Sequence, residues 1–109
     1  MRILQLPAFR EEMARFSEET REDIWLLVDR FLKRERLPHT SFKTFSIDKQ
    51  TRIQEFKVKD YRGNWRAISC IHEKELLVFV YAFHKKSQAL QEKDKRVIRQ
   101  RVQRIPYAT

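Results

Sequence analysis

The 109-residue sequence has one cysteine, one glycine and three prolines, and each scarcity excludes a class of protein. A single cysteine, Cys70, excludes an internal disulfide framework and a zinc site built from several cysteines. One glycine leaves no glycine-rich loop to cradle nucleotide phosphates. No apolar run approaches the roughly 18–20 residues of a transmembrane helix, and the N-terminus lacks the apolar stretch of a secretory signal. We therefore expect a cytoplasmic protein.

What the chain has in excess is positive charge, with a formal net charge of +9 and a pI near 10.1. The charge is unevenly distributed, because residues 1–40 are balanced whereas residues 41–84 carry a net +3 and residues 85–109 a net +6. This asymmetry favours a face that binds a polyanion. The plainer alternative is a solvated basic helix. With 41% hydrophobic residues, the chain has enough apolar material for one core, and we expect a single domain over residues 1–109.

The first forty residues predict two helices that form a hairpin. Pro7 suits the first turn of a helix, and helical spacing of large apolar residues predicts a helix over residues 7–16. Those apolar residues are Phe9, Met13 and Phe16. A second helix is expected to begin near Ser17 or Thr20 and to end before Pro38. A short strand at residues 2–5 is an option ahead of the hairpin.

The middle of the chain predicts a sheet, since residues from Arg52 onward alternate between apolar and charged types. The continuous apolar run Leu76–Phe83 suits a central strand covered on both faces, reached through a turn at Glu73–Glu75. Segment 39–51 has no clear period and is interpreted as a loop. A last, basic helix is expected to start after Ser87 as its cap. The predicted fold is α+β, an N-terminal helical hairpin on a small, mainly antiparallel twisted sheet with a C-terminal basic helix.

The position of the first hairpin turn determines which charged residues meet. A two-residue turn at Gly63-Asn64 pairs Arg62 with Trp65 and Tyr61 with Arg66. It places Glu55, Lys57, Lys59 and Arg66 on one face, whereas a loop of odd length would move Arg66 to the other. The next hairpin brings further basic residues to the same end of the sheet. The expected cluster consists of Lys57, Lys59, Arg62, Arg66, His84, Lys85 and Lys86. Gathering these cations is costly unless an anion binds there.

Three segments of this region resemble the RelE/HigB-like toxins of bacterial toxin–antitoxin pairs, in the branch related to phage-derived proteins. They are Glu55-Phe56-Lys57-Val58, Asn64-Trp65-Arg66-Ala67-Ile68, and Tyr81-Ala82-Phe83-His84-Lys85-Lys86-Ser87. The resemblance covers roughly residues 4–105 and includes the basic last helix. The sequence departs from the branch at Lys57, where arginine is more common, so charge is kept but bidentate geometry is not.

The resemblance implies a RelE-like fold and a ribosome-dependent endonuclease that cleaves mRNA in the A site without a metal or cofactor. In such a reaction the ribose 2′-OH attacks the adjacent phosphate, which needs a base, cationic donors and an acid. Carried over by position, Lys57 acts at the attacking hydroxyl, Arg66 stabilises the phosphate and Lys86 assists the leaving group. Lys59, Arg62 and Lys85 add phosphate binding. His84 is a further acid or base candidate because an unperturbed imidazole titrates near neutrality.

The implied partners are mRNA on the ribosome and a helix-turn-helix antitoxin that covers the basic face, with no membrane. Two other functions share parts of this pattern. A ParE-like toxin has the same fold but poisons DNA gyrase through protein contacts, and therefore needs no phosphate-stabilising cluster. A non-catalytic basic RNA-binding module would lose affinity steeply with salt, yet would keep much of its binding without Arg66 and Lys86.

Overall fold

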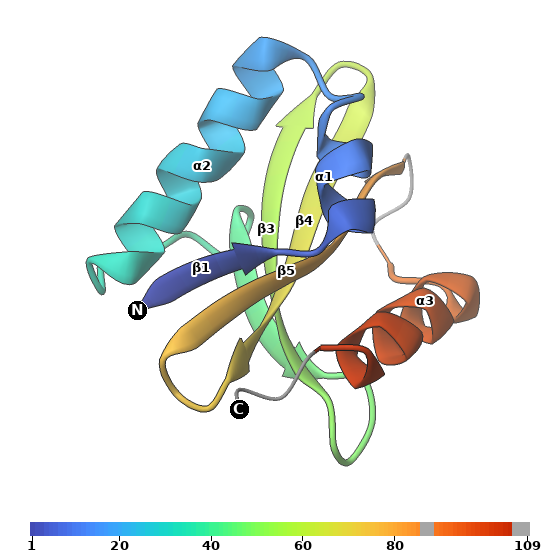
Figure 1. Cartoon of the computed structure of the whole chain (residues 1–109). Coiled ribbons are helices and arrows are strands. Elements are labelled where there is room, and N and C mark those ends of the chain that lie inside the picture. The colour runs from blue at the N-terminus through green and yellow to red at the C-terminus, as the bar shows by residue number, and fades with distance from the viewer. Residues whose placement is uncertain (86–88, 106–109) are drawn as a thin grey trace.

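One five-stranded sheet with helices against both faces forms the framework of the protein (Figure 1). The computed structural model describes residues 1–85 and 89–105. In chain order its elements are β1 (Arg2–Gln5), α1 (Pro7–Met13), α2 (Glu18–Leu32), β2 (Phe42–Ser46), β3 (Arg52–Asp60), β4 (Gly63–His72), β5 (Leu76–Lys85) and α3 (Glu92–Gln103). This is the predicted α+β class.

The chain opens with a strand, so the predicted N-terminal helical hairpin is wrong as the start of the fold. The sheet order is β1-β5-β4-β3-β2. β1 lies parallel to β5, from the pair Arg2 and Leu76 to the pair Gln5 and Phe79. All other pairs of neighbouring strands are antiparallel, which confirms the mainly antiparallel sheet. The strand option at residues 2–5 is therefore correct, and α1 follows it directly.

The helices are shorter than predicted, for reasons visible at their ends. α2 begins where expected, because the Ser17 side chain accepts a hydrogen bond of 3.1 Å from the backbone N–H of Thr20. It ends at Leu32, and Arg34 follows with a positive φ of 61° that breaks the helical path. The expected cap Ser87 lies outside the described residues, and α3 instead begins after Gln91, which closes a capping box with Asp94.

Segment 39–51 is not all loop, because β2 pairs along β3 from Phe42 opposite Phe56 to Ser46 opposite Arg52. The strand escapes pattern analysis because it is a short edge strand. Its two aromatic residues, Phe42 and Phe45, are three positions apart and therefore point to opposite faces of the sheet. The segment therefore lacks the alternation of apolar and polar residues by which a strand is recognised.

Two apolar clusters lie on opposite faces of the sheet. The first joins α1 and α2 to the sheet through buried residues such as Phe9, Ile24, Phe56 and Phe79. The second joins α3 to the other face around Ile98 and includes Ile53, Ile68, Val78 and Phe83. In Figure 1, α2 lies to the left of the sheet and α3 at its lower right. We call these the α1/α2 face and the α3 face.

The β3–β4 turn lies two residues earlier than predicted. Asp60 pairs with Gly63, so the turn residues are Tyr61 and Arg62. The Asp60 carboxylate accepts a 2.8 Å hydrogen bond from the Arg62 N–H, and Gly63 takes a φ of 129°. Asp60 and Gly63 occupy the first and fourth positions of this four-residue turn, where aspartate and glycine are favoured. The predicted turn at Glu73–Glu75 is confirmed, with positive φ at Glu73 and Lys74.

Candidate functional site

Three charged residues lie together on the α3 face near the centre of the sheet. In the observed register Lys57 is directly opposite Arg66, and Glu55 is opposite Ile68, whose side chain belongs to the α3 cluster. The predicted partners, Tyr61 opposite Arg66 and Arg62 opposite Trp65, are wrong. The predicted face is nevertheless correct, because moving the turn by two residues keeps the alternation of side chains.

Arg66 is the largest fully buried side chain of the described residues, at 1% exposure. Its Nη1 donates a 3.0 Å hydrogen bond to Oε2 of Glu55, which is 3% exposed. A buried charge of this kind is tolerated only with a compensating partner. Glu55 is therefore the residue that allows a guanidinium to sit inside the sheet face.

Lys57 is also buried, at 9% exposure. Burial lowers the pKa of its ammonium group, and the positive charge of Arg66 lowers it further, whereas the Glu55 carboxylate opposes the shift. Smaller contributions from Lys43 and Lys59 act in the same direction as Arg66. A lysine in this environment reaches its neutral, proton-accepting form at lower pH than an exposed lysine.

The ring of Phe83 supports two cations at the end of the same face. The Arg66 guanidinium carbon lies 5.9 Å and the Lys85 Nζ 5.6 Å from its centroid, within the range of a cation–π contact. Phe83 is directly opposite Arg66 across β4 and β5. Arg66 and Lys85 thus reach one aromatic platform, as the predicted convergence at this end of the sheet requires.

Lys85 is ion-paired with Asp94 of α3. Asp94 is 1% exposed and accepts a second hydrogen bond, of 2.9 Å, from the Tyr81 hydroxyl. Burial by itself would raise the pKa of Asp94, but the bonds from Lys85 and Tyr81 hold it below its ordinary value. Asp94 therefore neutralises one of the clustered cations and ties the start of α3 to the end of β5.

Sequence reasoning did not identify Asp94 or Tyr81 as part of the site. The signal was present in two places, because a tyrosine in an apolar strand needs a partner for its hydroxyl and an acid in the first turn of a helix suits its positive end. Glu55, in contrast, was expected on the same face as Arg66, and its hydrogen bond to Arg66 confirms this placement.

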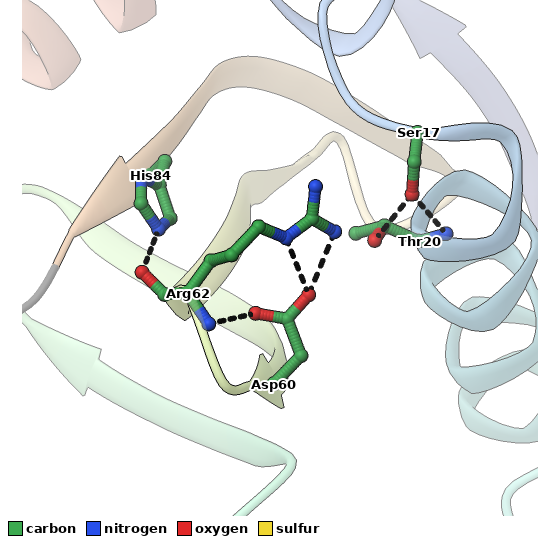
Figure 2. Close-up of polar contacts among 5 residues, drawn as sticks. All are labelled: Ser17, Thr20, Asp60, Arg62 and His84. Atoms are coloured by element: carbon green, nitrogen blue, oxygen red, sulfur yellow. Dashed lines mark hydrogen bonds and ion pairs between the residues drawn. The ribbon is translucent and has the colours of Figure 1, made fainter.

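His84 and Arg62 lie on the opposite, α1/α2 face. The His84 ring stacks on Trp65 with centroids 4.0 Å apart, and the Arg62 guanidinium carbon lies 4.8 Å from the Trp65 ring. His84 Nε2 donates a 2.6 Å hydrogen bond to the backbone oxygen of Arg62, and Asp60 holds the Arg62 side chain. Figure 2 draws both contacts. Both residues therefore lie at the predicted end of the sheet but on the other face from Lys57 and Arg66. His84 does so because neighbours along a strand alternate between faces, and Arg62 because it lies in the β3–β4 turn with its side chain over Trp65.

Of the remaining predicted residues, Lys59 is exposed on β3, two positions from Lys57 and hence on the same face. Lys86 lies outside the described residues and follows Lys85 in the chain. The structure thus brings Lys57, Arg66 and Lys85 together with Lys59 close by.

Within residues 1–85 and 89–105, no three histidine, cysteine, aspartate or glutamate side chains are grouped to hold a metal ion. None of the helices found there combines the length and apolarity needed to cross a membrane.

The fold and the site together define a class: a small basic α+β protein whose mainly antiparallel sheet carries buried cations compensated by single acids. The family model of the phage-derived Gp49-like proteins (DUF891) matches residues 11–103. Because this match covers most of the chain, the protein belongs to that family, which is a toxin-like family of the RelE/HigB type. A comparison with curated proteins gives no match.

Proposed function

We propose that the protein is the toxin of a toxin–antitoxin pair and that it cleaves mRNA on the ribosome without a metal ion. The observation that carries this proposal is the cross-strand position of Lys57, whose pKa is lowered, opposite Arg66 on the α3 face. Membership of a toxin-like family supports the same function. The cognate antitoxin, proposed as a helix-turn-helix protein, covers this basic face.

In the proposed reaction, neutral Lys57 accepts the proton of a ribose 2′-OH. The freed oxygen attacks the adjacent phosphorus and the bond to the 5′-oxygen breaks, which leaves a 2′,3′-cyclic phosphate and a 5′-hydroxyl. A lysine pKa below its usual value of 10.5 brings more of the neutral base to physiological pH.

Arg66 supplies a fixed positive charge beside the attacked phosphate. At 1% exposure it acts mainly through its field, which stabilises the developing negative charge and holds down the pKa of Lys57. Lys59, exposed on the same face, binds the RNA phosphates. Lys85 contributes positive charge at the end of the face, and Lys86 keeps the role of assisting the leaving oxygen that the resemblance implies. We assign no proton transfer to His84, which stacks on Trp65 on the other face.

The test compares the wild type with Lys57→Met and Lys59→Met after induction in bacteria. Both substitutions remove one lysine charge from the same face, but only Lys57 is buried beside Arg66. We avoid Arg66→Ala, because removing a buried ion-pair partner can unfold the chain. New 5′ ends are mapped on a translated message by primer extension, and their chemistry is read by 5′-kinase labelling.

We expect growth arrest with in-frame cuts bearing 5′-hydroxyl ends in the wild type, and fewer cuts at the same positions in Lys59→Met, which loses one phosphate contact but keeps the base. Lys57→Met, once shown to be folded by circular dichroism, should give neither. Blocking translation initiation should abolish the cuts. Arrest without cleavage would contradict the nuclease proposal and favour a gyrase poison. Salt-sensitive RNA binding without arrest would indicate a binding module instead.

A further inference from the structure

An open pocket of about 600 Å³ adjoins the Glu55–Arg66 pair on the α3 face. β2 and β3 form the floor of the pocket, and the segment before β2 forms one side. Ala89, Leu90 and the start of α3 form the other side. Its lining residues are Leu37, His39, Phe42, Lys43, Thr44, Phe45, Glu55, Arg66, Ala89, Leu90 and Lys95. Pockets of roughly 300–1,000 Å³ are the size that binds small molecules and nucleotides.

The pocket combines an apolar wall with a cationic rim. Phe45 and Leu90 pack at the margin of the α3 cluster and also line the pocket, so part of each side chain faces the cavity. Lys43 is exposed on the edge strand, and Lys95 stands on the first turns of α3, 3.7 Å from Glu92. Inside, Glu55 and Arg66 compensate each other. The remaining charge of the lining is therefore positive, and its ligand should be an anion with a flat apolar body.

We propose that this pocket binds one unpaired nucleotide of the RNA substrate, with its base against Phe45 and Leu90 and its phosphate at Lys43 and Lys95. The inference rests on the proposed function, since it places a nucleotide next to the one whose 2′-OH Lys57 deprotonates. Bases stack on aromatic side chains in single-stranded RNA sites, and lysines follow the backbone.

An acidic peptide is the competing occupant, because it also combines apolar groups with negative charge. Glu55 argues against it. Glu55 lines the pocket while Arg66 engages its Oε2, so a carboxylate group adjoins the cavity. Carboxylate oxygens pair with the N–H edges of bases but repel carboxylates. An RNA nucleotide therefore fits the wall and the rim together.

The test measures binding without cleavage. Its probe is a fluorescein-labelled tetranucleotide of 2′-O-methyl RNA, which cannot undergo 2′-OH attack, and its readout is fluorescence anisotropy at several salt concentrations. The matched pair of variants is Lys43→Ala and Lys49→Ala. Both lysines are exposed, but Lys49 lies in the β2–β3 connection and does not line the pocket. Phe45→Leu tests the apolar wall, with its folding checked by thermal unfolding.

We expect Lys43→Ala to weaken binding about fivefold and to reduce the salt slope by about 1, with less than a twofold effect of Lys49→Ala. Phe45→Leu should weaken binding about tenfold with an unchanged salt slope. Equal losses in the two lysine variants would overturn the inference, because binding would then follow net charge alone. The inference would also be overturned if an acetylated acidic heptapeptide with a central leucine bound in a manner that depends on Phe45 while the RNA probe did not.

The two proposals fail separately. Both proposals predict that Lys57→Met loses cleavage but still binds the tetranucleotide in the pocket. If the wild type cleaves mRNA while Lys43→Ala and Lys49→Ala bind the tetranucleotide equally well, only the pocket proposal is refuted. If the wild type binds the tetranucleotide in the pocket but cleaves no mRNA, only the nuclease proposal is refuted.

Discussion

Replacing Glu55 with glutamine isolates the electrostatic part of its interaction with Arg66. The two charged groups approach to 3.0 Å and are both almost fully buried. At an effective dielectric constant of about 20, their attraction is about 5–6 kcal/mol. The cost of burying each ion offsets part of this value, but the substitution leaves Arg66 buried without its counter-charge. We expect a loss of about 3–5 kcal/mol of unfolding free energy.

A double variant separates this loss from simple packing. Glu55→Leu/Arg66→Met replaces both charges by apolar groups of similar volume, and such replacements are often neutral or stabilising. We therefore expect the double variant to recover most of the stability that each single substitution loses. With a loss of about 3–5 kcal/mol in each single variant and about 1 kcal/mol in the double variant, the coupling between the sites should amount to about 5 kcal/mol or more.

Urea unfolding followed by tryptophan fluorescence measures the wild type, Glu55→Gln, Glu55→Leu, Arg66→Met and the double variant, since Trp25 and Trp65 are both half-buried. In thermal melts the Glu55→Gln variant should unfold at least about 12 °C below the wild type. Single variants within about 1 kcal/mol of the wild type would refute the reasoning, as would a double variant that loses the sum of the two single losses.

Three further predictions concern the same region. Asp94→Asn removes the counter-charge of Lys85 and should lower the unfolding free energy by about 3 kcal/mol at neutral pH. Because the folded pKa of Asp94 lies below 3.8, its contribution to stability is present above pH 3.8 and is lost as the pH falls through the folded pKa. Urea titrations in that acidic range should therefore show a pH dependence in the wild type that the variant lacks. Gly63→Ala places a Cβ 2.6 Å from the Lys85 backbone oxygen at a φ of 129°, so we expect a loss of about 2 kcal/mol in the same assay, and an unchanged stability would contradict the strained geometry. The Lys57 pKa, measured by NMR of its side chain, should lie below 10.5 and fall further in Glu55→Gln, because the carboxylate opposes the shift; a rise in that variant would disprove the assignment of causes.

The elements with a strong apolar pattern could be predicted from the sequence. Phe9, Met13 and Phe16 are all buried, as their helical spacing indicates, and the apolar run before Phe83 is a central strand. β2 could not be found, since its position at the sheet edge leaves only isolated aromatic residues in contact with the core. The order of the strands also needs contacts between residues far apart in the chain, which local patterns do not contain.

The residues of the candidate site could be predicted in part, and the register of the β3–β4 hairpin explains why. An error of two residues in the β3–β4 turn changed every cross-strand partner but kept Lys57 and Arg66 on one face. His84 and Lys85 are consecutive, so they could not both join that face. The acid that accompanies Lys85, Asp94, comes from a different element nine residues later, and only the packing of α3 on β5 brings it there.

The distribution of acids on the α3 face explains how a strongly basic chain folds around its own cations. Glu55 and Asp94 are each buried beside one of them and offset the charges of Arg66 and Lys85. Lys57 differs, because burial and the field of Arg66 outweigh the nearby carboxylate and lower its pKa. In the proposed function the two compensated cations contribute geometry and electrostatic field, whereas Lys57 exchanges the proton. The stability experiments measure the ion pairs without RNA, which is why the stability and cleavage experiments can be interpreted independently.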